Sequence, residues 1–384
     1  MSLSPDTLVA RALGGRASDT GAFPAPVSLG VTYVRDADYR LPAAMAYQRD
    51  QGSPGFAQVE RLLAELEHGT DALLMSSGMA ACTAVFQALP AGSRVVVPQV
   101  MYFGLTKWLR TFGVDQGLDV VEVPTGDLDA IGVALRAAPT ALLWIETPAN
   151  PTWAVTDVAA AADLAAAAGA VLAVDNTVPT PVHTNPLRLG AGIVMHSCTK
   201  YLNGHDDVVA GALVTDGSVP ELWSRIQLQR QLAGQVPGSL EAYLLQRGMR
   251  TLTVRMRAIS QSASAFAEHF SEHPAVERVA YPGLASDPGH KVAQSQMTGG
   301  YSGMLSVFLR GGREVALETA KATELFLPAT SLGGTASLIE HRFTFEGPGS
   351  RSPENMVRIS IGLEDTAELI ADLDQAISRA RTVA

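Results

Sequence analysis

Cysteine is nearly absent from this chain, and its scarcity excludes several kinds of site. Two cysteines, Cys82 and Cys198, occur among 384 residues. Neither lies in a metal-ligand or paired-cysteine spacing, so the sequence predicts no metal site and no disulfide framework. We expect a reducing, cytoplasmic location. The first residues also lack the apolar core of a signal peptide.

An excess of positive charge is missing as well. The chain has 28 Lys and Arg against 38 Asp and Glu, and a formal net charge of −10. Non-specific binding to nucleic acid and binding to anionic membranes both need a basic surface, so we expect neither partner. No apolar run approaches the ~18 residues that a membrane span needs. A hydrophobic content of 47% with 17% charged residues predicts a globular protein, and the length suits two domains.

The most informative stretch is Val174–His205, which reads V-D-N-T and then, from residue 196, H-S-C-T-K-Y-L-N-G-H. One short apolar run ends in Asp175. The next apolar run leads into Ser197, Thr199 and Lys200. Buried strands of an α/β protein bring such ends to one edge of the sheet, where these proteins build their sites. A carboxylate, an amine and two hydroxyls are the groups needed to hold and react pyridoxal phosphate.

A strand followed by a turn of small residues provides a candidate phosphate site. Ala72–Met75 is predicted to be a strand, and it runs into S-S-G-M-A-A at residues 76–81 and then into a helix. The free N–H groups at such a helix N-terminus suit a phosphate. Any tight turn between a strand and a helix uses small residues, so this signal alone is weak.

Several other side chains have two interpretations. Tyr102 follows a buried strand and either stacks on a flat cofactor or packs in the core. Asn150 lies between two prolines, whose stiff loop would hold its amide in one direction. Tyr47 and Arg49 are two residues apart in an extended segment, so they point to one side and either bind a ligand or form an exposed pair.

The order of the predicted elements indicates the architecture. From residue 72 to about residue 215, strands alternate with helices, which predicts a mostly parallel sheet with helices on both faces. Residues 1–50 lack sustained periodicity and are predicted to form an extended arm with one short helix, Pro5–Leu13. The alternation is less regular in the last third of the chain. We therefore expect a large domain over residues 51–250 and a smaller α+β domain over residues 251–384.

Seven motifs occur in the order found in one known family. They are S-S-G-M-A-A at 76–81, E-T-P-A-N-P at 146–151, V-D-N-T at 174–177, H-S-C-T-K-Y-L-N-G-H at 196–205, Y-P-G-L at 281–284, S-L-G-G at 331–334 and R-I-S-I-G-L-E-D at 358–365. On these motifs the chain resembles the pyridoxal-phosphate enzymes of cysteine and methionine metabolism, which are cystathionine synthases, cystathionine lyases and methionine γ-lyases. The resemblance implies an aspartate-aminotransferase-like (type I) fold and a homotetramer, a dimer of dimers whose subunits share sites.

The resemblance implies a role for each candidate around the cofactor. Lys200 would bind the aldehyde carbon and carry protons, which requires a lowered pKa. Asp175 would pair with the pyridine nitrogen, although an Asp after a strand is also a common helix cap. Tyr102 would stack on the ring and act as an acid or base. Asn150 would bind the phenolic oxygen of the ring.

The same resemblance divides the remaining residues between the substrate and the phosphate. Arg358 would hold the α-carboxylate of an amino-acid substrate bidentately, aided by Ser337. Ala336 stands where family members often have a carboxylate associated with cystathionine recognition. The phosphate would be bound by the backbone of Gly78 and Met79, by the hydroxyls of Ser197 and Thr199 and, from a neighbouring subunit, by Tyr47 and Arg49.

Departures from the family pattern bear on the substrate. Gly104 replaces the active-site cysteine of methionine γ-lyases, Phe103 replaces the usual glycine, and Trp153 replaces a smaller aliphatic residue. The segment Ile339–Ser352 also departs from the usual loop rich in proline, alanine and serine.

The leading hypothesis is a lyase that removes a Cα proton and then a Cβ proton, and expels the γ-substituent of a sulfur-containing or O-substituted homoserine-type amino acid. The alternative is γ-replacement, as in cystathionine γ-synthases and O-acylhomoserine sulfhydrylases. A γ-lyase for an unusual leaving group, such as that of canavanine, is a third hypothesis. A cofactor-binding regulator without catalysis would not need the carboxylate clamp at Arg358.

Overall fold

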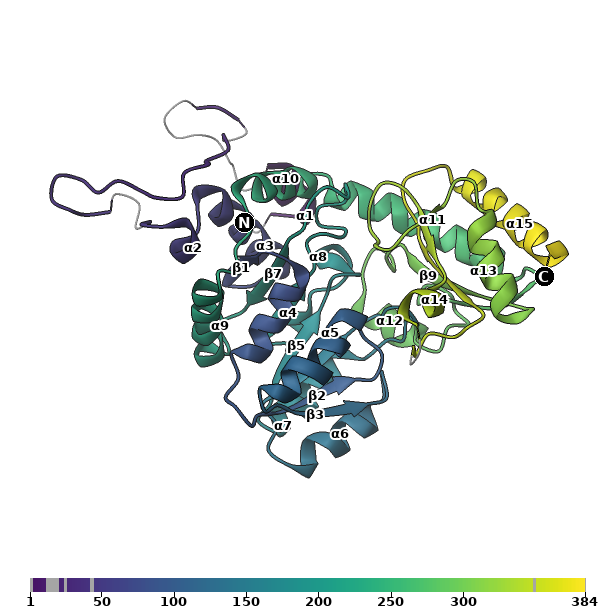
Figure 1. The fold of residues 1–384 in the computed structure, drawn as a ribbon, viewed down its shortest axis with the longest axis horizontal. Helices are drawn as coiled ribbons and strands as arrows, with labels where there is room; N and C mark the ends of the chain where they lie inside the picture. The colour runs from purple at the N-terminus through teal and green to yellow at the C-terminus, as the bar shows by residue number, and fades with distance from the viewer. Residues whose placement is uncertain (1–2, 12–20, 24–25, 42–44, 348–349, 384) are drawn as a thin grey trace.

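Two β-sheets organise the structure. The computed structural model describes residues 3–11, 21–23, 26–41, 45–347 and 350–383, and within these ranges the chain forms a seven-stranded and a five-stranded sheet (Figure 1). The larger sheet has the strand order β1-β7-β6-β5-β4-β2-β3. Its strands are β1 (Asp71–Met75), β2 (Arg94–Pro98), β3 (Asp119–Val123), β4 (Leu142–Glu146), β5 (Val171–Asp175), β6 (Ile193–His196) and β7 (Gly211–Thr215).

Helices cover both faces of this sheet (Figure 1). One face is covered by α4 (Gly78–Gln87), α5 (Phe103–Trp108) and α9 (Pro220–Ala233), and α5 continues as a π-helical segment, Leu109–Gly113. The other face is covered by α3 (Pro54–Glu67), α6 (Leu128–Ala137) and α7 (Val158–Ala167). Two short elements follow β5, α8 (Thr180–His183) and a 3-10 helix at Pro186–Leu189, and α10 (Ser239–Met249) follows α9.

The large sheet is mostly parallel, as predicted. Strands β2 to β6 pair in parallel, whereas β7 is antiparallel to both β6 and β1. All five residues of β4 are buried. A strand that is covered on both faces needs apolar side chains on both, which is why the first four residues of β4 form a continuous apolar run. The carboxyl ends of β4, β5 and β6 therefore meet at one edge.

The five-stranded sheet has the order β10-β11-β12-β9-β8. The long helices α11, α13 and α15 pack on it and bury a core that includes Phe266, Phe270 and Phe326. The elements of this part are α11 (Leu252–Ser271), β8 (Val276–Ala280), α12 (His290–Gln296), β9 (Met304–Leu309), α13 (Gly312–Ala322), β10 (Leu327–Pro328), β11 (Leu338–Glu340), α14 (Arg342–Glu346), β12 (Met356–Ser360) and α15 (Thr366–Val383).

A glycine inside a helix allows two segments to pack closely. Gly248 lies within α10, and the break between α10 and α11 comes only at Arg250 and Thr251. A Cβ at Gly248 would collide with the carbonyl oxygen of Asn203, so the glycine is needed for this packing.

The N-terminal arm has two parts. Helix α1 (Pro5–Arg11) packs on α3 and α11, where Leu8 and Val9 are buried. The end of the predicted helix, Ala12 and Leu13, lies outside the described residues. The later part of the arm projects from the body before it reaches the short helix α2 (Gln48–Gln51) (Figure 1). Within the described part of the chain, no helix is both long and apolar enough to cross a membrane.

Candidate active site

One cavity lies where the carboxyl ends of β4, β5 and β6 face the five-stranded sheet. Its volume is about 350 Å³, which is in the range of small-molecule sites. Glu146 and Asp175 end β4 and β5, and the segment Ser197–Lys200 follows β6. From the five-stranded sheet and its loops, the wall is completed by Thr330, Ser331, Leu332, Arg342 and Arg358.

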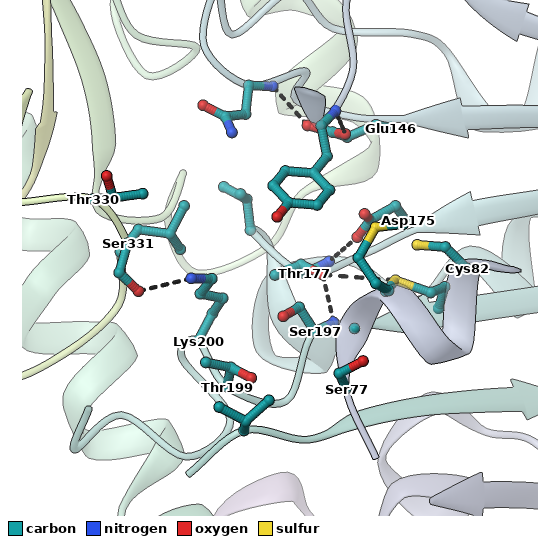
Figure 2. A pocket seen from close by; sticks show the side chains of 18 of the residues that line it. Ser77, Cys82, Glu146, Asp175, Thr177, Ser197, Thr199, Lys200, Thr330 and Ser331 are labelled. Carbon is teal, nitrogen blue, oxygen red and sulfur yellow. Dashed lines mark hydrogen bonds between the residues drawn. The ribbon is translucent and has the colours of Figure 1, made fainter. Parts of the chain in front are cut away.

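The N-terminus of α4 lies at one end of the cavity (Figure 2). Ser77 caps the helix with its side-chain oxygen. The N–H groups of Gly78 and Met79 belong to the first turn, where a helix supplies no backbone acceptors. A Cβ at Gly78 would lie 2.7 Å from Ser197 Oγ, so only glycine allows this close approach. These N–H groups and the Ser197 hydroxyl can donate hydrogen bonds to a phosphate. The Thr199 hydroxyl also lines the cavity, but it donates to the Ala210 carbonyl oxygen at 3.2 Å, so it would have to exchange this acceptor for a phosphate oxygen.

Two buried carboxylates lie side by side on neighbouring strands. Glu146 on β4 and Asp175 on β5 are opposite each other in the register of the two strands. Burial and the nearby Asp175 raise the pKa of Glu146 to about 8. Burial also raises the pKa of Asp175, while hydrogen bonds from Thr177 lower it. Burial thus raises the pKa of both acids, and the positive charge of a protonated pyridine nitrogen would favour the anionic form of Asp175.

Lys200 points into the cavity from the turn after β6 (Figure 2). Its Nζ donates a hydrogen bond to Ser331 Oγ at 2.7 Å. Burial first, and the nearby Arg358 second, lower the pKa of Lys200 to about 8. This is the direction expected for a group that reacts as a neutral amine and carries protons.

Tyr102 and Asn150 are held by the same acid. Glu146 accepts hydrogen bonds from the Tyr102 N–H at 2.6 Å and from the Asn150 N–H at 2.8 Å. The Asn150 Oδ1 accepts from Arg358 Nη1 at 3.2 Å, which leaves the amide NH₂ for an acceptor such as a phenolic oxygen. Burial raises the pKa of Tyr102, so the phenol is protonated at neutral pH. A Cβ at Gly104 would lie 2.6 Å from the Tyr102 ring, so a cysteine there would displace the ring.

These groups fit pyridoxal phosphate. The space left by Gly78 beside Ser197 is a cradle for a phosphate at a helix N-terminus. Asp175 offers a buried anion to the pyridine nitrogen, and Lys200 offers an amine to the aldehyde. Tyr102 lies over the same cavity with an exposed fraction of 44%, so its ring is available for stacking.

Two residues predicted at the substrate lie elsewhere. Ser337 is completely buried; its hydroxyl donates to Glu364 Oε2 and accepts from the Gly362 N–H, so it joins the loop before β11 to the segment after β12. Neither Ser337 nor Ala336 lines the cavity, and Ser331 does so instead. The loop of residues 329–337 has no helical or strand periodicity. The sequence therefore does not predict which of its side chains point into the cavity.

The aromatic departures also lie outside this cavity. Phe103 lines a smaller neighbouring cavity. Trp153 is buried, and its Nε1 donates to Ser306 Oγ at 2.8 Å. Neither residue lines the larger cavity: Trp153 is buried beside Ser306, and Phe103 is exposed.

Tyr47 and Arg49 are not at this cavity in their own chain. Tyr47 has an exposed fraction of 43%, and Arg49 pairs with Asp50 at 3.1 Å beside the Tyr47 ring. The pair is therefore accessible at the surface.

Among the cavity residues that were not predicted are Glu146, Ser331 and Arg342. Glu146 is the first residue of the E-T-P-A-N-P motif and ends a buried strand. An acidic residue at the end of an apolar strand is the pattern that predicted Asp175, so the same pattern could have predicted Glu146. Ser331 opens the S-L-G-G motif. Arg342 lies in the segment that departs from the family pattern, and no motif marks it.

Comparisons with known proteins show the family and the fold. A family model for Cys/Met metabolism PLP-dependent enzymes matches residues 6–378. A cystathionine gamma-synthase of Mycobacterium bovis is 41% identical over 93% of this chain and 92% of its own length. A cystathionine gamma-lyase of Dictyostelium discoideum is 36% identical over 95% and 96%. The crystal structure of cystathionine gamma synthase from Xanthomonas oryzae pv. oryzae in complex with cystathionine has a TM-score of 0.95 at 32% identity and covers 100% of both chains, which confirms the predicted fold.

Proposed function

The chain belongs to the family of Cys/Met metabolism PLP-dependent enzymes, and from this premise we propose that it is a lyase that eliminates the γ-substituent of an amino acid. Its cofactor is pyridoxal 5'-phosphate, and its substrate is an amino acid. When bound, pyridoxal phosphate supplies an electron sink for the charge that develops at the substrate Cα. The observation that carries the proposal is that Lys200, Tyr102 and Arg358 line one cavity.

The cofactor-binding residues have separate tasks in this proposal. Asp175 would pair with the pyridine nitrogen, and its carboxylate would hold a proton there. Asn150 donates its amide to the phenolic oxygen, in an orientation fixed by Arg358. The phosphate is bound by the N–H groups of Gly78 and Met79 and by the hydroxyls of Ser197 and Thr199.

Two residues move protons. Lys200, as a free amine, would take the proton from the substrate Cα, release it to the C4′ carbon of the cofactor, and then take one from Cβ; a pKa near neutrality suits a group that both accepts and returns protons. Ser331 orients this amine through the 2.7 Å hydrogen bond. Tyr102, protonated at neutral pH, donates a proton toward the leaving group.

Arg358 binds the α-carboxylate. Among the described residues it donates to Asn150 Oδ1 at 3.2 Å, to the Ser331 carbonyl oxygen at 3.1 Å and to Glu340 Oε2 at 2.7 Å. A guanidinium has five N–H donors, and the Nε–H and one Nη1–H remain without these acceptors. Because these two groups point to different sides of the guanidinium, a bidentate carboxylate would take the place of one Nη2 acceptor, such as the Ser331 carbonyl oxygen. The clamp selects α-amino acids and places Cα beside Lys200.

The second candidate is γ-replacement, in which a thiol takes the place of the leaving group. The observation that favours it is the 41% identity to a protein named cystathionine gamma-synthase. Both reactions need the same residues up to loss of the γ-substituent. They differ in whether a second substrate then enters the cavity.

We further propose a cytoplasmic homotetramer in which the arm, residues 1–50, reaches a neighbouring subunit and brings Tyr47 and Arg49 to its phosphate. The projecting arm exposes Leu29, Val34 and Tyr39 by 73%, 87% and 77%, and a partner subunit would cover such apolar side chains. The boundary between the large domain, 51–250, and the C-terminal domain, 251–384, falls between α10 and α11 in this proposal.

A substrate screen tests the function. L-methionine, L-cystathionine, L-homocysteine and O-substituted homoserines are incubated with the holoenzyme, and release of 2-oxo acid and ammonia is measured. Turnover of at least one compound is expected, and no turnover of any contradicts the lyase. Adding L-cysteine to the activated homoserines separates the candidates, because replacement gives a coupled thioether and lowers oxo-acid release.

A further inference from the structure

A buried row of four charged side chains lies at the wall of the cavity. Arg358 Nη2 and Arg342 Nη1 both donate to one oxygen, Glu340 Oε2, at 2.7 and 2.9 Å. Arg342 also donates through Nε and Nη2 to Glu346 Oε1, at 3.1 and 2.7 Å. All four side chains have exposed fractions of 10% or less. The order is Arg358, Glu340, Arg342, Glu346, so the sign of the charge alternates.

Local structure brings these residues together. Glu340 on β11 is the register partner of Arg358 on β12, so their side chains share one face of the sheet. Arg342 and Glu346 are the first and last residues of α14, at the i,i+4 spacing that allows an ion pair. The remaining carboxylate oxygens of this row accept hydrogen bonds from Thr330, Ser350 and Ser352.

The row is neutral in sum, but its charges do not all face the same way. Arg342 and Arg358 line the cavity, whereas Glu340 and Glu346 do not. Two cations therefore face the substrate, with two anions behind them. Buried ion pairs are weak contributors to stability, because apolar residues of similar volume often serve as well. Because the two cations of this row face the cavity, a role in binding an anionic group explains the row better than a contribution to stability does.

The shared oxygen explains why a second guanidinium is present. Glu340 alone would hold the Arg358 guanidinium in place but would also neutralise it. Because Arg342 bonds to the same oxygen, the negative charge of Glu340 is divided between two cations, and Arg358 keeps more of its attraction for an incoming carboxylate.

We propose that Glu340 and Arg342 are positioning residues of the carboxylate clamp: Glu340 orients Arg358, and Arg342 preserves the positive charge that Arg358 presents to the substrate. This inference rests on the proposed role of Arg358. It predicts that loss of Arg342 weakens binding of the α-carboxylate specifically, and leaves binding of the rest of the amino acid unchanged.

The test compares two ligands of the holoenzyme. L-norleucine has no γ-substituent to lose, and L-norleucinamide lacks the carboxylate; binding of each is followed by the absorbance change of the bound cofactor. The double variant R342Q/E346Q removes one cation and one anion together, so neither partner is left as an unpaired buried charge. Its Kd for norleucine is expected to rise about tenfold or more, while its Kd for the amide stays within about twofold.

Arg351→Gln is the matched control. Arg351 lies in the same segment and pairs with Glu122 at 2.7 Å, but it does not line the cavity. Neither Kd is expected to change. Equal weakening of acid and amide in R342Q/E346Q, or unchanged binding of the acid, overturns the inference.

Two more variants keep the test decisive. Should R342Q/E346Q fail to fold, Arg342→Lys keeps a cation at the cavity and is expected to retain the preference for the acid within about threefold; a loss as large as that in Arg358→Gln overturns the inference. Arg358→Gln itself tests the underlying function. If it keeps the preference, the proposed clamp is wrong; if it loses the preference and R342Q/E346Q does not, only the present inference fails.

Discussion

Uptake of pyridoxal phosphate by the cofactor-free protein is expected to follow the ionisation of Lys200. Only a neutral amine attacks an aldehyde. Burial and the nearby Arg358 lower the pKa of Lys200 from 10.5 to about 8. At pH 7 about a tenth of the amine is then neutral, against roughly 0.03% for a lysine with an unperturbed pKa, so the cavity raises the reactive fraction about 300-fold.

Stopped-flow absorbance measures this directly, by mixing cofactor-free protein with pyridoxal phosphate between about pH 6.5 and 10. Since the protonated amine dominates below the pKa, the rate constant should rise about tenfold per pH unit and level off near pH 8. Lys200→Ala measures the background reaction of other lysines. Arg358→Gln removes a cation that disfavours the ammonium form of Lys200, so it should raise the pKa of Lys200. The bend in the pH profile, which is the pH at which the rate constant levels off, should then move to higher pH. A rate that keeps rising to about pH 10, or a bend that moves to lower pH in this variant, would refute the reasoning.

Four further predictions concern the cofactor and the fold. Lys200→Ala is expected to lose both turnover and the visible absorption band of a yellow holoenzyme; a native protein that stays colourless after cofactor addition contradicts the assignment. Arg49→Ala should release cofactor more readily on dialysis through loss of an intersubunit contact, which a fully active monomer in sedimentation would disprove. Gly78→Ala should lower cofactor affinity about tenfold or more with the fold intact, because the new methyl would lie 2.7 Å from Ser197 Oγ; unchanged affinity would mean that this turn does not bind the phosphate. Trp153→Ala should lower the free energy of unfolding in urea by about 3–5 kcal/mol, since the side chain is buried, and a loss below about 1 kcal/mol would count against its packing role.

The residues at the ends of the parallel strands were the predictable part of the site. Asp175, Ser197, Thr199 and Lys200 each follow an apolar run, and parallel strands bring such ends to one edge whatever the details of packing. The helix start at Gly78 was predictable for a related reason, because a strand, a turn of small residues and a helix form a local unit. These signals need only short stretches of sequence.

The substrate side depends on contacts between distant segments, and the sequence does not specify them locally. Ser331 and Ser337 lie in one irregular loop, and only the folded chain shows that Ser331 faces Lys200 while Ser337 bonds to Glu364. The pairing of Glu340 with Arg358 likewise follows from the register of β11 and β12. A one-residue shift of that register would separate them, so no pattern within either strand predicts the pair.

The hydrogen bonds of Trp153 have a consequence for motion. Ser306 on β9 accepts the indole N–H and donates to the Pro151 carbonyl oxygen at 2.8 Å, and in the neighbouring strand its register partner is Arg358. The loop that carries Asn150 is thus attached to both sheets, because the Asn150 N–H donates to Glu146 at the end of β4. A rotation of one sheet against the other would have to break one of these bonds, so we expect the spacing between the ring-oxygen site and the carboxylate site to be kept throughout the cycle.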